Sequence, residues 1–435
     1  MSTPAAGGES DGRAPGAESR AESRAAATRF ASAPGGTVGP RSESTALAQA
    51  PGVARTALRD TIGALAGPLT GLSRRLHAHP ETAWEEEKAA RWTASLLDDL
   101  GYAVTPGVCD LPTAFSARIG SGPLHVALCA EYDALPGLGH ACGHNLIAAS
   151  AVGAAAGLAR VADDLGLTVT VLGTPAEEGG GGKILMLERG AFDGVDVAMM
   201  VHPGPVDVAE AEPFAVAHLG VRYTGRAAHA AAYPERGRNA ADAFTVAQVG
   251  IGLLRQQLPA GTRVHGLVTR GGEAPNAIPE RTEGRWYVRA ADLEELERVQ
   301  SRVEACFRAG ALAAGCALEI EPESPPYSEF RGDPELLARY RRNAEGIGRR
   351  FAAPGDPAAR MNRASTDMGN VSRVVRALHP YIGVDSLPAV NHQREFAAAC
   401  ATPAADAALL DGALALALTA ADLAASDGAT ARRTP

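Results

Sequence analysis

Several residues with the chemistry of metal ligands and proton acceptors lie in short strings that follow apolar runs. Cys142 and His144 are two residues apart in a glycine-rich stretch. Residues i and i+2 of an extended segment point to the same side, so this thiolate and this imidazole can bind one cation. The other candidates are Glu177, Glu178, His202 and His392.

Each of these strings also has a plain structural explanation. A cysteine in an apolar chain is often a small buried residue, and a Glu-Glu pair is usually a solvated surface. Position favours a metal site instead, because the Cys-x-His, Glu-Glu and His-Pro strings each follow a successive predicted strand. An open α/β sheet brings the carboxyl ends of its strands together, and ligands bind at that edge. The sequence therefore predicts a metal centre.

The predicted ligands suit two divalent cations. Cys142 supplies a thiolate and Glu178 a carboxylate, so the ligand set carries two negative charges. The remaining ligands, His144, His202 and His392, are neutral imidazoles. Two divalent cations leave such a site positive even with a bridging hydroxide, which favours an anionic transition state. Thiolate and imidazole ligands favour zinc, with manganese or cobalt as alternatives.

Glu177 is adjacent to the predicted ligand Glu178 and is therefore free to act as a general base. It would take a proton from a metal-bridging water as that water attacks an amide carbonyl, and it would return the proton to the leaving amine. These roles predict hydrolysis of an amide bond.

The elements predicted to position these residues alternate between strand and helix. Predicted strands are the apolar runs 124–130, 167–174 and 195–201. Predicted helices are 53–78, 85–101, 145–165 and 180–190. This alternation is typical of an α/β fold with a mostly parallel sheet flanked by helices on both faces.

The pattern changes near residue 214. From there to 325 the predicted order is strand, helix, two strands, helix and strand, which indicates an inserted α+β sandwich with antiparallel strands. The two ends of the chain have few apolar side chains and are predicted to be disordered. The predicted parts are a tail (1–52), a catalytic domain in two pieces (53–213 and 326–425), the inserted domain (214–325) and a second tail (426–435).

Composition excludes several classes of protein. The formal net charge of the 435-residue chain is −9, and no concentrated basic patch is visible, so we expect no nucleic-acid partner. The longest apolar run, 146–159, is too short to span a bilayer, so we expect no membrane partner. Six cysteines in a chain this long make no disulfide framework, and no export signal is visible, so we expect a cytoplasmic protein.

The sequence resembles the aminoacylase and glutamate-carboxypeptidase family of co-catalytic metallopeptidases, peptidase family M20. The matching strings are LHAHPETAWEE, EYDALPGLGHACGHN, GTPAEEGGGG, VHPG, GRAAHAAAYPERGRNA, PNAIPE, STDMGNVS and AVNHQREFA. The branch it resembles contains auxin-conjugate and aminobenzoyl-glutamate amidohydrolases, and two of the strings look most like β-alanyl-lysine-type dipeptidases. The resemblance implies that Glu177 is the general base. It implies the same five metal ligands as above: Cys142, His144, Glu178, His202 and His392.

The resemblance also implies that the inserted domain is a lid through which two chains form a homodimer. His229 would reach the active site of the partner subunit and polarise the scissile carbonyl, although a surface turn is the alternative. Asn276 and Arg289 would hold the substrate carboxylate or backbone, and Asn276 has a turn role as its alternative.

Two positions depart from the family pattern. Asn145 stands where many relatives have Asp, so the expected partner of the neighbouring histidine lacks a charge. Glu131 stands where more distant members have a liganding histidine, and its carboxylate would bind or orient a ligand instead. Asp133 is expected to support the ligands, with a structural hydrogen bond as the alternative.

The sequence thus predicts a dinuclear metal-dependent amidohydrolase or dipeptidase. Its substrate would be a β-alanyl or similar dipeptide with a basic side chain, or an N-acyl or aromatic-acyl amino acid. The alternative is a non-catalytic relative that binds a metal or an amino-acid derivative. A structural zinc protein is excluded because the ligands are spread over about 250 residues, whereas structural sites have short spacings.

Overall fold

The computed structural model describes residues 47–431. The predicted tails therefore lie largely outside the described residues, at 1–46 and 432–435. At the C-terminal end, helix α13 (Pro403–Ala431) continues past residue 425, where the catalytic domain was expected to end.

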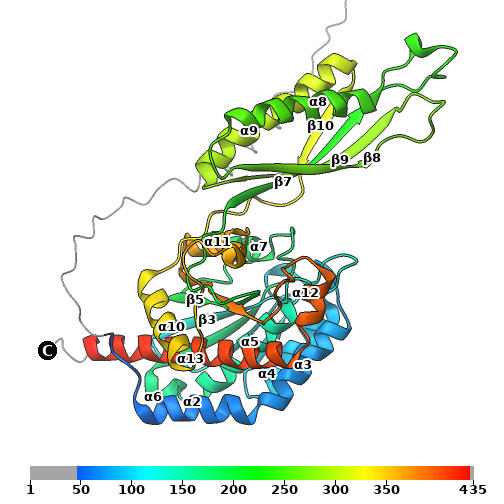
Figure 1. Cartoon of the computed structure of the whole chain (residues 1–435). Coiled ribbons are helices and arrows are strands. Elements are labelled where there is room, and N and C mark those ends of the chain that lie inside the picture. The colour runs from blue at the N-terminus through cyan, green and yellow to red at the C-terminus, as the bar shows by residue number, and fades with distance from the viewer. Residues whose placement is uncertain (1–46, 432–435) are drawn as a thin grey trace, which may run out of the picture. The chain divides into compact units, whose positions relative to one another are not determined.

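A six-stranded sheet forms the centre of the larger domain (Figure 1). Its strands, in spatial order, are β1 (Ala103–Pro106), β2 (Phe115–Ile119), β4 (Leu167–Gly173), β3 (Leu124–Ala130), β5 (Val197–Met199) and β11 (Arg376–Leu378). The four strands from β4 to β11 run parallel, and β1 and β2 form an antiparallel edge. The predicted mostly parallel sheet is therefore confirmed. Strands β3 and β4 are apolar and buried because helices cover both faces of a parallel sheet.

The N-terminal helices are α2 (Gly52–Ala64), α3 (Ala66–Ala78) and α4 (Glu87–Asp99). The single helix expected at 53–78 is wrong, since the helix is interrupted at Leu65. Pro68 explains the break: its ring clashes with the carbonyl four residues earlier, and it has no N–H to donate there.

Two apolar helices pack against each other beneath the sheet, α5 (His144–Ala159) and α13 (Figure 1). The helix predicted at 145–165 ends earlier, and a short helix α6 (Ala162–Leu165) follows it. The stretch Pro403–Ser426 of α13 is long and apolar enough to cross a membrane, but 78% of it is buried. A helix in the interior of a domain has this composition, and the burial favours that explanation.

The remaining elements of this domain lie outside the six-stranded sheet. They are α7 (Gly182–Glu188), β6 (His202–Gly204), α10 (Pro334–Gly346), α11 (Met368–Ser372), β12 (Tyr381–Gly383) and α12 (Arg394–Ala399), with 3₁₀ turns at Val108–Asp110 and Pro357–Arg363. Strands β6 and β12 pair in parallel, with His202 beside Tyr381.

The inserted segment has its own antiparallel sheet and its own core. In chain order its elements are β7 (Ala215–Thr224), α8 (Ala240–Leu254), β8 (Arg263–Arg270), β9 (Arg281–Ala290), α9 (Leu293–Ala314) and β10 (Ala317–Pro322), with 3₁₀ turns at Pro234–Arg236 and Arg255–Gln257. The strand order is β10-β7-β9-β8, and α8 and α9 lie side by side on one face (Figure 1). Phe244, Trp286 and Phe307 are buried between the sheet and these helices, which closes a separate hydrophobic core.

Candidate metal centre

The predicted ligands follow the ends of three neighbouring strands. The loop after β3 leads to Cys142, and α5 begins at His144. Glu178 follows β4, and His202 opens β6 just after β5. Because β4, β3 and β5 are adjacent and parallel, their carboxyl ends meet at one edge of the sheet.

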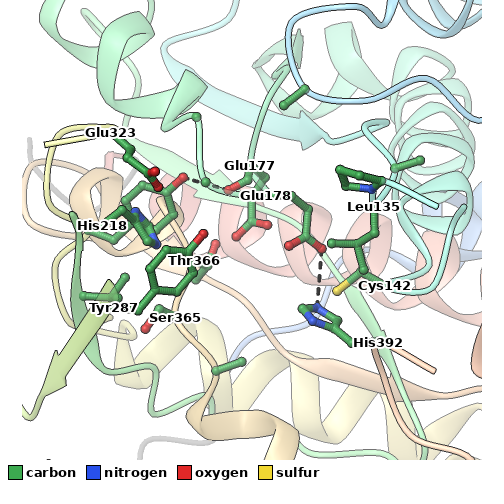
Figure 2. Close-up of a pocket in the computed structure, with 18 of the residues that line it drawn as sticks. Leu135, Cys142, Glu177, Glu178, His218, Tyr287, Glu323, Ser365, Thr366 and His392 are labelled. Carbon is green, nitrogen blue, oxygen red and sulfur yellow. Dashed lines mark hydrogen bonds and ion pairs between the residues drawn. The ribbon is translucent and has the colours of Figure 1, made fainter. Parts of the chain in front are cut away.

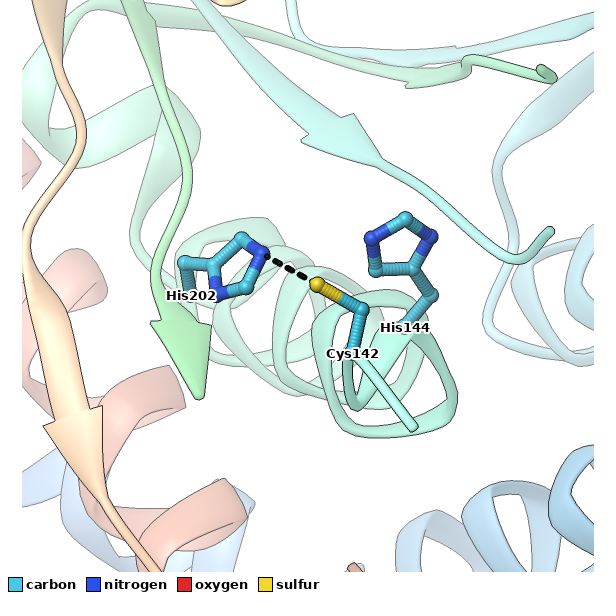
Figure 3. Close-up of side chains that lie close together, drawn as sticks. All are labelled: Cys142, His144 and His202. Carbon is cyan, nitrogen blue, oxygen red and sulfur yellow. Dashed lines mark hydrogen bonds between the residues drawn. The ribbon is translucent and has the colours of Figure 1, made fainter. Parts of the chain in front are cut away.

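Cys142, His144 and His202 form one buried cluster (Figure 3). The Cys142 Sγ lies 3.5 Å from the His202 Nε2. Each of the three residues offers one ligand atom, and these three atoms lie within 4.8 Å of one another. His202 is oriented by its Nδ1, which lies 2.8 Å from the Pro203 carbonyl oxygen. Its Nε2 is thereby left as the metal-binding nitrogen, because a neutral imidazole that donates from one nitrogen accepts at the other.

Cys142 also belongs to a second cluster, with Glu178 and His392 (Figure 2). The His392 Nε2 lies 3.5 Å from the Glu178 Oε1. His392 is the exposed ligand, with 52% of its side chain accessible, and its backbone has a φ of 68°. Left-handed backbone at a residue other than glycine is costly, and such strain is concentrated at functional sites.

The atoms that a cation needs lie ready between these clusters. The His144 Nε2 and the Glu178 Oε1 are buried, 3.9 Å apart, and neither makes a hydrogen bond within the described residues; the nearest contact of the Glu178 oxygen to a histidine is the 3.5 Å ion pair with His392. Leaving such atoms unsatisfied in the interior costs about 1–3 kcal/mol each. A bound divalent cation would satisfy both, so the donor set fits the metal ions expected from the sequence.

Asp133 holds two of the ligands at once. Its Oδ1 accepts a hydrogen bond of 3.0 Å from the His144 Nδ1, which leaves the opposite nitrogen for a metal. Its Oδ2 accepts one of 2.9 Å from the backbone N–H of Glu178. One carboxylate therefore fixes ligands that follow two different strands.

Asn145 faces away from the ligands, contrary to what the sequence suggested. Its side-chain amide donates to the Ser73 hydroxyl at 2.8 Å and to the Cys400 carbonyl at 3.0 Å. It makes no hydrogen bond to His144. The expected role as partner of the neighbouring imidazole is taken by Asp133, so Asn145 ties α5 to α3 and α12 instead.

Glu177 is buried beside the ligands and is held through its backbone. Burial raises the pKa of this carboxyl well above its usual value, and the carboxylates of Glu131 and Glu178 raise it further. The Tyr327 hydroxyl donates to the Glu177 carbonyl at 2.7 Å. The preceding residue, Ala176, has a φ of 56° and donates its N–H to Glu86 at 2.7 Å. These contacts aim Glu177 without occupying its carboxylate.

Glu131 is tied to a buried lysine that sequence reasoning missed. The Lys183 Nζ lies 2.6 Å from the Glu131 Oε1 and 2.7 Å from the Asp367 Oδ1, and all three side chains are fully buried. Burial by itself would raise the pKa of Glu131, but Lys183 and the neighbouring histidines lower it to about 2. The available signal was the rarity of lysine, since Lys88 and Lys183 are the only two among 41 basic residues.

A cavity of about 610 Å³ opens onto the metal centre. Its lining comes from both domains: the larger domain contributes Cys142, Glu177, Glu178, His202 and His392, and the inserted domain contributes His218, Tyr287, Arg289 and Glu323. Figure 2 shows part of this lining, with His218, Tyr287 and Glu323 across the cavity from Cys142 and His392. Arg289 donates to the Ser365 hydroxyl at 2.6 Å and so lies at the wall where the inserted domain meets the 365–366 segment. Its guanidinium offers the cavity a fixed positive charge.

His229 and Asn276 are not brought to this cavity. Both are exposed and lie on neighbouring chain segments, where the Asn276 carbonyl accepts from the Ala230 N–H at 3.0 Å. The His229 Nδ1 accepts from the N–H groups of Ala231 and Ala232, at 3.3 and 3.1 Å. The neutral ring therefore carries its hydrogen on Nε2, pointing away from its own turn.

The fold and the site together define a metal-dependent hydrolase. An α/β sheet gathers thiolate, imidazole and carboxylate ligands around unsatisfied atoms, beside one carboxylate that stays free to move a proton. Residues 127–410 match the model of Peptidase family M20/M25/M40. This match covers more than half of the chain, so the chain belongs to that family.

Curated relatives have peptidase and amidohydrolase names. The Xaa-Arg dipeptidase of Mus musculus is 42% identical over 367 residues, which are 80% of this chain and 84% of that protein. A p-aminobenzoyl-glutamate hydrolase from Escherichia coli is 35% identical over 273 residues, which are 58% of this chain and 56% of that protein. The family predicted from the sequence is confirmed.

Solved structures have the same fold. A dinuclear metal-binding peptidase of the M20 family from Bacillus subtilis matches 83% of this chain and 99% of its own, with a TM-score of 0.61 and 21% identity. The aminobenzoyl-glutamate utilization protein of Klebsiella pneumoniae matches 81% and 98%, with a TM-score of 0.62 and 22% identity. The chain is thus a metal-dependent hydrolase of amide bonds, as the sequence predicted.

Proposed function

We propose that the chain is a two-metal dipeptidase whose substrates have a basic residue at the C-terminal position. The observation that carries the proposal is the pair of ligand atoms without hydrogen bonds, His144 Nε2 and Glu178 Oε1. They lie at a cavity that is lined by Glu178 itself, by Arg289 and by the proposed base Glu177. The basic residue is supported by the likeness to proteins named Xaa-Arg dipeptidase.

Five residues would hold the two ions: Cys142, His144, Glu178, His202 and His392. Cys142 belongs to both clusters of potential ligands, so it is the natural shared ligand. When bound, the ions would polarise the scissile carbonyl and lower the pKa of an attacking water. Zinc suits the thiolate and imidazole donors best, and manganese or cobalt are the alternatives to test.

Glu177 would act as the general base and then as the general acid. Its carboxylate lines the cavity, makes no hydrogen bond to another described residue, and is aimed through contacts to its backbone. It would accept the proton of the attacking water and deliver that proton to the nitrogen of the leaving amine. The carboxylate moves a proton in each half of the reaction and ends unchanged.

Arg289 would bind the substrate carboxylate. It is the cavity arginine that contacts Ser365, and a guanidinium pairs with a carboxylate through two parallel hydrogen bonds. Arg285, also in the lining, is engaged by Glu323 at 2.5 and 2.8 Å. Arg289 is therefore the more available cation for a C-terminal carboxylate.

His229 would act in the cavity of a second copy of the chain. It is exposed and lies outside the cavity lining of its own chain, and its Nδ1 accepts from backbone N–H groups, which leaves Nε2 as the donor of the neutral ring. That N–H is a suitable donor to a carbonyl oxygen that gains negative charge. Asn276, next to it, would help to position the same substrate.

The inserted domain has a surface suited to such a dimer. Val246, Val249 and Leu253 are 39, 60 and 71% exposed and line one face of α8. Strand β8 is an edge of the four-stranded sheet, so its outer side has no partner strand among the described residues. An apolar helix face beside an open strand edge is what a two-fold interface would bury.

We also propose that the enzyme works in a reducing compartment, the cytoplasm. All six cysteines are free, and one of them is the proposed shared ligand, which must remain a thiolate.

A parallel hydrolysis screen tests the proposed function. The metal-loaded protein would be offered β-alanyl-arginine, β-alanyl-lysine, N-acetyl amino acids and aminobenzoyl-glutamate. We expect the basic dipeptides to have the highest kcat/KM, loss of activity on chelation, and recovery with zinc or manganese. Preference for an N-acyl amino acid would overturn the substrate assignment, and two bound ions without hydrolysis of any substrate would support a non-catalytic relative.

A further inference from the structure

The structure contains three clusters of potential ligands among its described residues, although the proposed mechanism uses two. The first two share Cys142 and hold the proposed ions. The third consists of Glu131, His144 and Glu177, whose ligand atoms also lie within 4.8 Å of one another and are all buried. Two carboxylates and one imidazole are a suitable set for a divalent cation, manganese in particular.

An ion in this third cluster would damage the enzyme. It would engage Glu177, whose carboxylate must stay free to accept a proton. It would also compete for the His144 Nε2, which lies 3.4 Å from Glu131 and 3.9 Å from Glu177. The proposed mechanism therefore needs a feature of the chain that disfavours cation binding in the third cluster but not in the first two.

Lys183 lies where it would do this. Its ammonium is 2.6 Å from the Glu131 Oε1, whereas the other carboxylate oxygen, Oε2, is the one that contacts His144. It is held there by Asp367, which accepts from the Lys183 side chain at 2.7 Å and from its backbone N–H at 2.8 Å. In the dry interior this fixed positive charge reduces the attraction of Glu131 for any further cation.

Lysine suits this task better than the arginine that this chain otherwise prefers. An ammonium is a compact point charge that can sit between two carboxylates, whereas a planar guanidinium needs more room. The Lys183 side chain is fully buried, so the space around it is closed. It is one of two lysines in a chain with 41 basic residues.

We propose that Lys183 is an internal cation that keeps a metal ion out of the Glu131–His144–Glu177 cluster, and thereby keeps Glu177 free as the base. The inference rests on the proposed function, because the harm it prevents is loss of that base. Lys183 is a positioning residue, since it acts through Glu131 and touches no substrate.

Two double variants of equal charge give the sharpest test. Lys183→Met/Asp367→Asn removes the ammonium and leaves the Glu131 carboxyl without this partner. Lys183→Met/Glu131→Gln removes the ammonium and leaves Asp367 instead, which belongs to none of the three clusters. The two proteins differ only in which carboxylate survives. Bound manganese would be measured per chain by equilibrium dialysis across a series of free manganese concentrations, with the wild type alongside.

We expect about two ions per chain in all three proteins, with the same manganese affinity in the wild type and in Lys183→Met/Glu131→Gln. In Lys183→Met/Asp367→Asn we expect one ion to bind more tightly, because the freed Glu131 carboxylate adds a ligand beside the single available His144 Nε2. Equal binding by the two double variants would overturn the proposal. A wild type that binds no metal would instead contradict the proposed function, so the two failures are distinguishable.

Thermal unfolding of the metal-free proteins provides a second measurement. Lys183→Met alone leaves two buried carboxylates without a counter-ion, and we expect its midpoint to fall by roughly 4–6 °C. Each double variant keeps only one of the two carboxylates, so both should regain part of this loss. If Lys183→Met/Glu131→Gln unfolds as early as the single variant, the lysine acts by packing rather than by charge, and the proposal is wrong.

Discussion

The two regions that carry the expected catalytic residues are built in opposite ways. At the carboxyl edge of the central sheet, ligands such as His144 are buried and fixed by a second residue, Asp133. On the inserted domain, His229 and Asn276 are exposed, and their contacts are to backbone groups of the two neighbouring segments that carry them. The metal ligands at the sheet edge are thus held within one chain, whereas these two side chains of the inserted domain face solvent.

This difference separates what one chain can do from what two chains would do. A buried ligand set with supporting hydrogen bonds is preorganised, so metal binding needs no other subunit. An exposed imidazole has a catalytic use only where it meets a substrate, and the cavity of its own chain does not include it. The following variants test each side of the comparison.

The largest effect is expected for Glu177→Gln. The amide keeps the shape of the side chain but cannot accept the proton, so kcat should fall by roughly 10³–10⁴-fold. Bound metal, measured by elemental analysis, should stay near the wild-type value. Glu178→Gln is the matched control, since it changes the adjacent ligand and should lose metal as well. Full activity in Glu177→Gln would contradict the proposed role of Glu177 as the general base.

The next largest effect belongs to the inserted domain. His229→Ala should reduce kcat by about 10²-fold, because one donor to the developing oxyanion is lost, while metal content is unchanged. Glu177→Gln and His229→Ala chains would be mixed in equal amounts, unfolded together and refolded. Half of the resulting dimers would be mixed, and each mixed dimer would have one intact site of two, so about a quarter of wild-type activity should return. No recovery in dimers proven to be mixed would mean that each site is built from one chain.

The sequence was informative wherever a local pattern decided the structure. Apolar runs bounded by Gly and Pro predicted β3 and β4 closely, because both strands are buried on both faces. The position of Cys142, Glu178 and His202 after successive strands then predicted that they would meet, since parallel strands end at one edge.

The sequence was less informative wherever a contact joins distant segments. The Lys183 contacts to Glu131 and Asp367 connect residues separated by 52 and 184 positions in the printed sequence, and no local pattern indicates them. Asn145 was assigned to the neighbouring histidine because the two are adjacent. In a helix, however, consecutive side chains point in different directions, so adjacency did not mean contact.

A smaller effect, on metal affinity, is expected for Asp133→Asn. The amide oxygen can still accept from the His144 ring, but the amide nitrogen would face the backbone N–H of Glu178, which is also a donor. Loss of this contact and of the charge should weaken metal binding by about 10–100-fold, measured by competition with a chelator. Unchanged affinity would show that the ligands are held without Asp133.

The smallest effect on metal binding is expected for Asn145→Ala. Its amide donates to Ser73 and to the Cys400 carbonyl, so its removal should lower the free energy of unfolding by about 1–3 kcal/mol. Metal affinity in the same competition assay should change less than about threefold, because the imidazole of His144 keeps Asp133 as its partner. If Asn145→Ala instead weakened metal binding as much as Asp133→Asn, the support of the ligands would extend through α5 itself, and the metal centre would depend on helix packing rather than on one carboxylate.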